Sequence, residues 1–167
     1  MKEPSRSAAA VLWESMGDRM SDYELPSWDT TGDQRKRFAA LLSSGVASPW
    51  TTSMGRLFDA VSSLTGLCHR PSFEGQAAMA VEFAAERAQA DERDFAAGYP
   101  LDLTEPVDPG SSLVVDWRPM MRAMLDDLRR SCRPELIAAR FHAGLVAGIV
   151  RVAQAAGLPR EIGRAHV

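Results

Sequence analysis

The chain has 167 residues, of which 46% are hydrophobic and 25% charged, a composition typical of one folded globular domain. Its 22 acidic and 19 basic residues leave a net charge of −3, which excludes the general basic field of a nonspecific nucleic-acid binder. Charged residues interrupt the longest apolar runs before they reach the roughly 20 residues of a membrane span. We therefore expect a cytoplasmic protein without a nucleic-acid or membrane partner.

Hydrophobic spacing and turn residues predict a mainly α-helical chain with one small β-hairpin. The two expected strands are joined by a turn that contains two prolines and a glycine. Helical patterns cover residues 8–16, 32–44, 54–67, 74–90, 117–130 and 134–157; loop-like segments cover 18–32 and 45–53; the strands are 99–103 and 112–116, with the turn at 104–111.

The pattern of helix 32–44 predicts which of its side chains meet the core. Asp33 is the expected cap at its N-terminus. Leu41 is expected to face inward with Phe38, and Arg35 is expected to face water.

The two C-terminal helices are expected to be core helices. The methionines of helix 117–130 recur at helical spacing, and Met adapts to irregular packing, so we interpret them as core rather than as a cofactor site. In helix 134–157, Phe141 and Ile149 belong to one apolar stripe.

Cysteines and histidines predict no metal site and no nucleophile. Cys68 and Cys132 are far apart and lack a neighbouring base, so both are expected to be reduced, small packing residues. No two histidines have metal-ligand spacing, and His142 is interpreted as a packing or helix-surface residue.

The run from residue 48 to residue 80 is the most informative part of the sequence. It contains the string M-G-R-L-F-D-A-V, a T-G-L exit and then F-E-G-Q-A-A-M. This run resembles the C-terminal transferase domain of the hydrogenase maturation carbamoyltransferases (HypF), where T-S-S-M-G-R-L-F-D-A-V precedes Y-E-G-Q-A-A-M. The resemblance covers about residues 3–158 and implies a partial lobe of an actin/Hsp70-like (ASKHA) α/β domain.

The resemblance also implies an activity. In this family, carbamoyl phosphate and ATP form carbamoyl adenylate, and the carbamoyl group passes to the C-terminal Cys thiol of the partner protein HypE. The divalent metal of the parent enzyme is held by histidines of a motif that this chain lacks, so no catalytic or metal-binding residue is expected here. Two alternatives stay open: a tRNA threonylcarbamoyl transferase relative, and a helical interaction module without catalysis.

Asp59 is the first candidate for the nucleotide-binding site. The resemblance implies that its carboxylate contacts the ribose of the nucleotide, a task that suits a group able to accept two charge-assisted hydrogen bonds from a diol. The alternative is a solvated helix carboxylate.

Three further residues are implied as candidates by the same resemblance. Gly75 is expected to lie against the nucleotide, and it can also serve as a helix cap because Gly tolerates positive φ. Glu74 either lines the site or only favours the helix N-terminus through the dipole. Gly55 opens the preceding helix beside Arg56, for which pairing with a neighbouring carboxylate is the simpler role.

The end of the chain differs from the rest. Residues 162–167, I-G-R-A-H-V, match the translation of a common sequencing adapter. We therefore expect a partial carbamoyltransferase domain at residues 1–160 and a foreign tail at 161–167; the alternative is a natural polar tail.

Overall fold

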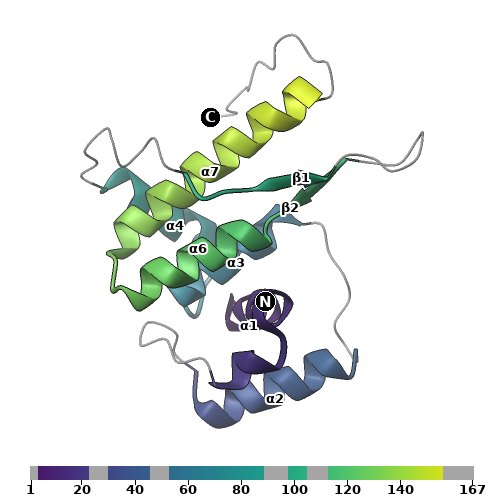
Figure 1. Cartoon of the computed structure of the whole chain (residues 1–167). Helices are drawn as coiled ribbons and strands as arrows, with labels where there is room; N and C mark the ends of the chain where they lie inside the picture. Colours follow the sequence, from purple (N-terminus) through teal and green to yellow (C-terminus); the bar gives the residue numbers. More distant parts are fainter. Residues whose placement is uncertain (1–3, 23–29, 46–52, 89–97, 105–112, 156–167) are drawn as a thin grey trace.

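The computed structural model describes residues 4–22, 30–45, 53–88, 98–104 and 113–155, and Figure 1 shows the arrangement of its elements. The helices are α1 (Pro4–Met16), the 3₁₀ helix η1 (Gly17–Asp22), α2 (Gly32–Ser43), α3 (Met54–Leu64), α4 (Gln76–Glu86), α6 (Arg118–Arg129) and α7 (Pro134–Ala155). Strands β1 (Asp102–Thr104) and β2 (Val114–Asp116) pair antiparallel, with Leu103 opposite Val115. The expected fold class, mainly α with a small hairpin, is confirmed.

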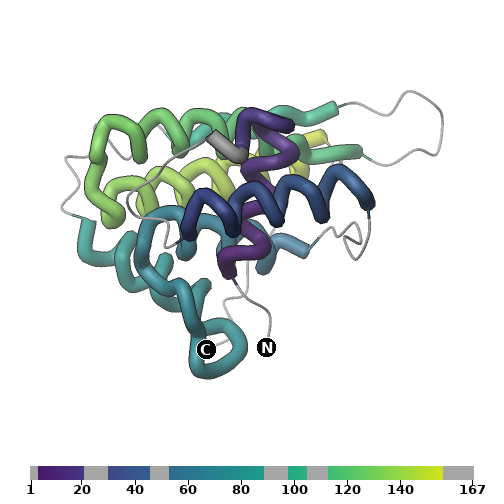
Figure 2. The backbone as a smooth tube through the Cα atoms, turned by 90° about the horizontal axis from the view of Figure 1, so that it is seen from below, coloured from purple at the N-terminus to yellow at the C-terminus, as the bar shows by residue number. Residues whose placement is uncertain are grey.

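Helix α3 packs against both α1 and α4. One side of α1 contacts α2 and η1, and another contacts α3 and α6. Helix α4 packs against both α3 and α7, and α7 also contacts α6 (Figure 1). Figure 2, seen from below, shows α2 crossing over α1. The start of α4 is therefore held directly beside α3, which positions the candidate site.

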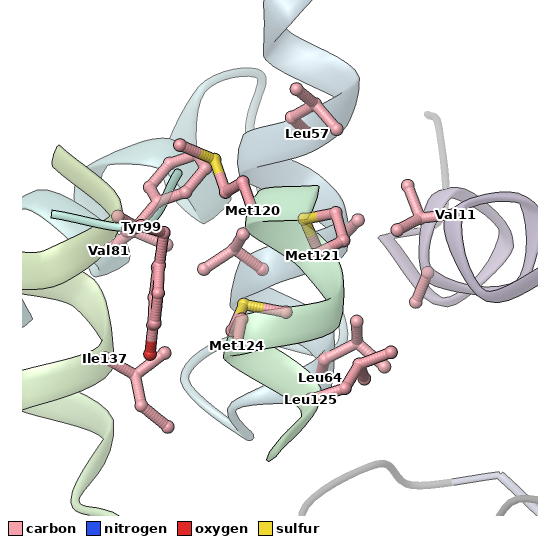
Figure 3. Close-up of a cluster of buried hydrophobic side chains, with 14 of the residues drawn as sticks. Val11, Leu57, Leu64, Val81, Tyr99, Met120, Met121, Met124, Leu125 and Ile137 are labelled. Carbon is pink, nitrogen blue, oxygen red and sulfur yellow. The ribbon is translucent and has the colours of Figure 1, made fainter. Parts of the chain in front are cut away.

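The core is built from apolar faces that the sequence pattern predicts. Met120, Met121 and Met124 of α6 are fully buried, so the methionine face belongs to the core as expected (Figure 3). From α3, the buried Leu57 and Leu64 face the same cluster. Burying one such side chain contributes roughly 1.5–3 kcal/mol.

The segment before β1 lies directly against α7. The backbone N–H of Tyr99 donates to the Arg140 carbonyl over 3.1 Å. A methyl group on Gly144 would lie less than 3.0 Å from the Tyr99 carbonyl oxygen, which real Cβ atoms essentially never do. Glycine at position 144 is therefore what allows this close approach between a helix and an extended segment.

Three expectations for α2 are wrong. Its N-cap is Thr31, which forms a capping box with Gln34. The Thr31 hydroxyl accepts a hydrogen bond from the Gln34 backbone N–H over 3.2 Å, and the Gln34 side-chain oxygen accepts one from the Thr31 backbone N–H over 2.8 Å. Asp33 therefore sits in the first turn, after the cap. Arg35 is only 8% exposed, because its guanidinium reaches back to the Thr30 carbonyl, and Leu41 is 44% exposed.

The apolar stripe of α7 is buried only in its first part. Phe141 is fully buried, but Ile149 is 59% exposed and its neighbours Val146 and Val150 are exposed as well, so the described elements leave this side of α7 uncovered. By length and composition α7 could span a membrane, and 39% of its most apolar window is buried inside the protein; one such helix does not establish a membrane span.

Several expected boundaries differ from the observed ones. Helix α4 begins two residues later and ends before the expected residue 90, and both strands are shorter than expected. The first expected loop begins with the 3₁₀ helix η1. Of the expected turn at 104–111, Thr104 is the last residue of β1 and the others lie outside the described residues, as does the tail at 161–167.

Candidate functional site

A hollow of about 250 Å³ lies where the first turns of α3 face the loop that leads into α4. Its walls are formed by Arg56, Asp59, Pro71, Phe73, Glu74, Gly75 and Ala77. The fold thus brings together three candidate residues, Asp59, Glu74 and Gly75. Two of them precede α4 and one belongs to α3.

Helix periodicity turns Asp59 towards this hollow. Leu57, Val61 and Leu64 are buried on the core face of α3 and fix the rotation of the helix. Asp59 lies off that face, and its side chain is 16% exposed. It is therefore more enclosed than a solvated helix carboxylate.

Arg56 and Asp59 form an ion pair across one turn of α3. Arg56 Nη1 lies 2.5 Å from Asp59 Oδ2, so the expected pairing with a neighbouring carboxylate is observed. An ionised carboxylate offers roughly four acceptor positions, more than one guanidinium contact uses. The pair can hold the Asp59 carboxylate in one orientation at the wall of the hollow.

Gly75 has a backbone conformation that favours glycine. It is the N-cap of α4, with φ of 87°. A Cβ at this position would meet no atom within 4 Å, so conformation rather than crowding explains the glycine. Because the cap has no side chain, the backbone at the positive end of the α4 dipole is open to the hollow.

The other two candidates differ in position. Glu74 is exposed and lines the hollow. Gly55 lies in the first turn of α3, exposed and outside the residues that form the wall. A methyl group on Gly55 would meet Ser53 Oγ at the ordinary distance of 3.5 Å. The hollow is thus built without Gly55.

A second hollow, of about 330 Å³, contains a polar cluster that sequence reasoning missed. Tyr99 Oη and Arg140 Nη1 each donate to Asp127 Oδ2 over 2.7 Å. Asp127 is only 7% exposed. These residues lie 28 and 13 positions from Asp127, so no local spacing could reveal them.

The electrostatics of this cluster favour a structural role. Burial, reinforced by the hydrogen bond to Asp127, raises the pKa of Tyr99. Burial and the nearby Asp127 charge raise the pKa of the Cys132 thiol. Both groups are held protonated, so neither is an activated nucleophile. This agrees with the expectation that Cys132 is not catalytic.

The described residues also allow a comparison with the expectations for His142 and for metal binding. His142 Nδ1 lies 2.9 Å from the Ala138 carbonyl oxygen, and its ring meets Phe58 and Phe141 edge-on, so His142 is a packing residue. Within the described ranges, no group of three His, Cys, Asp or Glu side chains could hold a metal ion. The described residues therefore do not fit the divalent metal that the family resemblance implies.

Comparison with known proteins gives consistent results. Residues 1–165 match the family model described as the second subdomain of the carbamoyltransferase Kae1-like domain. Carbamoyltransferase HypF from Synechocystis is 35% identical over 174 residues, covering 96% of this chain and 21% of the relative. Carbamoyltransferase HypF from Rhizobium leguminosarum is 33% identical, covering 68% of this chain and 13% of the relative.

A solved structure shares the fold. The crystal structure of full-length HypF in its phosphate- and nucleotide-bound form superposes with a TM-score of 0.73 at 21% identity, covering 93% of this chain and 22% of that chain. The chain therefore spans about a fifth of the length of these two relatives. Its fold is a partial lobe of a larger transferase, and by the match over residues 1–165 the chain belongs to the HypF carbamoyltransferase family.

Proposed function

We propose that this chain forms one wall of the nucleotide site of a carbamoyltransferase. In the proposed reaction, the parent enzyme uses carbamoyl phosphate and ATP to make carbamoyl adenylate, and transfers its carbamoyl group to the C-terminal Cys thiol of HypE in the cytoplasm. The observation that supports the proposal is the meeting of Asp59, Glu74 and Gly75 at one hollow, in a chain of the HypF family.

In this proposal the ribose of the adenylate is held by Asp59. Its carboxylate accepts hydrogen bonds from the two vicinal hydroxyl groups, while the ion pair with Arg56 keeps it oriented. Gly75 lets the nucleotide approach the backbone at the start of α4, because no side chain projects from the cap. Glu74, exposed at the wall, completes the set of residues that we assign to this hollow, whereas Gly55 lies outside the wall and only opens the helix that carries Asp59.

The family resemblance and a relative support this assignment of ligand. A full-length HypF has been crystallised in a nucleotide-bound form, and it shares the fold of this chain. The hollow, at about 250 Å³, lies below the roughly 300–1,000 Å³ of complete small-molecule sites. It is therefore large enough for part of a nucleotide, and the remaining contacts belong to the rest of the parent enzyme.

Substitution of Asp59 tests the proposal in a full-length carbamoyltransferase that carries this segment. Charge-assisted hydrogen bonds contribute about 1.5–3 kcal/mol, so Asp59→Asn and Asp59→Ala should weaken the affinity for a non-hydrolysable ATP analogue about ten- to a hundredfold. Calorimetric titration measures this affinity, and thermal unfolding of the same samples reports stability.

A matched control lies on another helix. Asp126 pairs with Arg129 across one turn of α6, with Nη1 and Oδ1 3.3 Å apart, and lies outside the candidate site. Asp126→Asn should leave nucleotide affinity unchanged. If Asp59→Asn binds the analogue as tightly as wild type, the ribose role is refuted, and a loss of stability alone would make Asp59 a structural partner of Arg56.

A further inference from the structure

Phe73 is an exposed aromatic residue at the wall of the candidate site. Its side chain is 50% exposed, although a phenyl ring is among the side chains that gain most from burial. The ring lines the same hollow as Arg56, Asp59 and Glu74, just before the Gly75 cap. The wall of the hollow therefore combines an exposed aromatic ring with charged side chains, and these two kinds of group contact different parts of a ligand.

We propose that Phe73 stacks on the base of the bound nucleotide. This inference rests on the proposed nucleotide site and adds the residue that contacts the base. A flat aromatic ring offers a π-face to a base, whereas the polar residues of the wall suit the ribose. In this arrangement Phe73 contacts the base of the nucleoside, and Asp59 on α3 contacts its sugar.

The size of the hollow is consistent with this division. At about 250 Å³ the hollow is smaller than a complete small-molecule site, so it holds only part of the nucleotide, and we assign the base and the sugar to that part. Loss of one base–aromatic stack weakens binding by roughly ten- to a hundredfold. The effect of Phe73 should therefore be as large as that of Asp59, but confined to ligands that carry a base.

The chain offers a matched control for this residue. Phe83 in α4 is 46% exposed, nearly as much as Phe73, and lies outside the residues that line the hollow. Phe73→Leu and Phe83→Leu therefore remove the same aromatic ring at two exposed positions, and keep an apolar side chain at both. Phe73→Trp keeps and enlarges the aromatic face.

The experiment measures ligand affinities in a full-length carbamoyltransferase that carries this segment. The two ligands are a non-hydrolysable ATP analogue and ribose 5-phosphate, which has no base. Phe73→Leu should weaken the affinity for the ATP analogue about ten- to a hundredfold and leave that for ribose 5-phosphate unchanged. Phe73→Trp should bind the analogue at least as tightly as wild type, and Phe83→Leu should bind both ligands normally.

Several outcomes would overturn the stacking role. An unchanged affinity of Phe73→Leu for the ATP analogue, while Asp59→Asn still weakens it, refutes stacking and leaves the proposed nucleotide site intact. Equal losses for both ligands, or a loss in Phe73→Trp as large as in Phe73→Leu, would mean that the loop rather than the ring matters. Failure of wild type to bind the analogue would refute the nucleotide site and the stacking role with it.

Discussion

A single buried carboxylate connects three segments of the described chain. Asp127 in α6 accepts hydrogen bonds from Tyr99, which precedes β1, and from Arg140 in α7, both over 2.7 Å. A buried charge is tolerated when such partners satisfy it, and removing one partner leaves it uncompensated. The cluster therefore fixes how the hairpin segment and the two C-terminal helices meet.

Tyr99 should make the stability of the chain depend on alkaline pH. Burial and then the hydrogen bond to Asp127 raise its folded-state pKa above the ordinary value of 10.0. Below about pH 10 the phenol is protonated in both states, so its contribution is fully present. Above pH 10 the unfolded state loses the proton first, and the free energy of unfolding should fall by about 1.4 kcal/mol per pH unit.

Urea unfolding of the chain between pH 8 and pH 11 measures this dependence. Tyr99→Phe should show a shallower decline above pH 10, because it has no phenolic proton to lose. At pH 8 the variant should already be less stable by about 1–3 kcal/mol, since Asp127 has lost a donor. Parallel declines in wild type and Tyr99→Phe would contradict the assignment.

At the scale of elements, two glycines one turn apart on α7 shape its packing. A methyl group on Gly144 would lie less than 3.0 Å from the backbone oxygen of Tyr99 and from the end of the Met120 side chain. A methyl group on Gly148 would also come too close, but to the end of the Leu101 side chain. At position 144 the added methyl group would meet backbone, which cannot move without disturbing the segment that leads into β1. At position 148 it would meet a flexible side chain, which can rotate away.

Alanine substitutions distinguish the two positions. Gly144→Ala should destabilise the chain by roughly 1–3 kcal/mol, because overpacking pushes Tyr99 away from α7. Gly148→Ala should change stability by less than about 1 kcal/mol, because the gain in helix propensity offsets the shift of Leu101. Chemical denaturation of both variants checks this, and equal losses would show that the approach of Tyr99 does not constrain α7.

At the scale of the whole molecule, the chain contains one part of a larger catalyst. It covers 21% of the Synechocystis relative and 22% of the solved HypF chain. The hollow between α3 and α4 is open and small, and no group of three potential metal ligands meets within the described ranges. In the proposed function, the rest of the parent enzyme supplies the remaining parts of the transferase site.

The purified 167-residue chain should therefore transfer no carbamoyl group. The test supplies carbamoyl phosphate, ATP and HypE, and mass spectrometry of the C-terminal Cys of HypE detects carbamoylation. A full-length HypF serves as the positive control. Transfer by the chain alone would contradict this expectation and would require catalytic groups that we have not identified.

Local sequence patterns determined much of the candidate site. Helix periodicity puts Leu57 on the core face and Asp59 off it, and the i,i+3 spacing places Arg56 beside Asp59. The positive φ of Gly75 likewise follows from what a single residue allows. That Asp59 and Gly75 lie at the same hollow was expected only from the family resemblance. No local spacing in the sequence predicts how α3 packs against α4.

Tertiary structure decided what depends on partners from distant segments. Ile149 fits the apolar pattern of α7 as well as Phe141 does, yet it is exposed because none of the described elements covers its side of the helix, although Gly148 on the other side lies against Leu101. The hydrogen bond between Tyr99 and Asp127 joins residues 28 positions apart, so only the tertiary structure reveals it. Phe73 lines the hollow because the loop before α4 lies against α3. Periodicity predicts which side chains share one face of a helix, but whether that face is buried depends on the elements that pack against it.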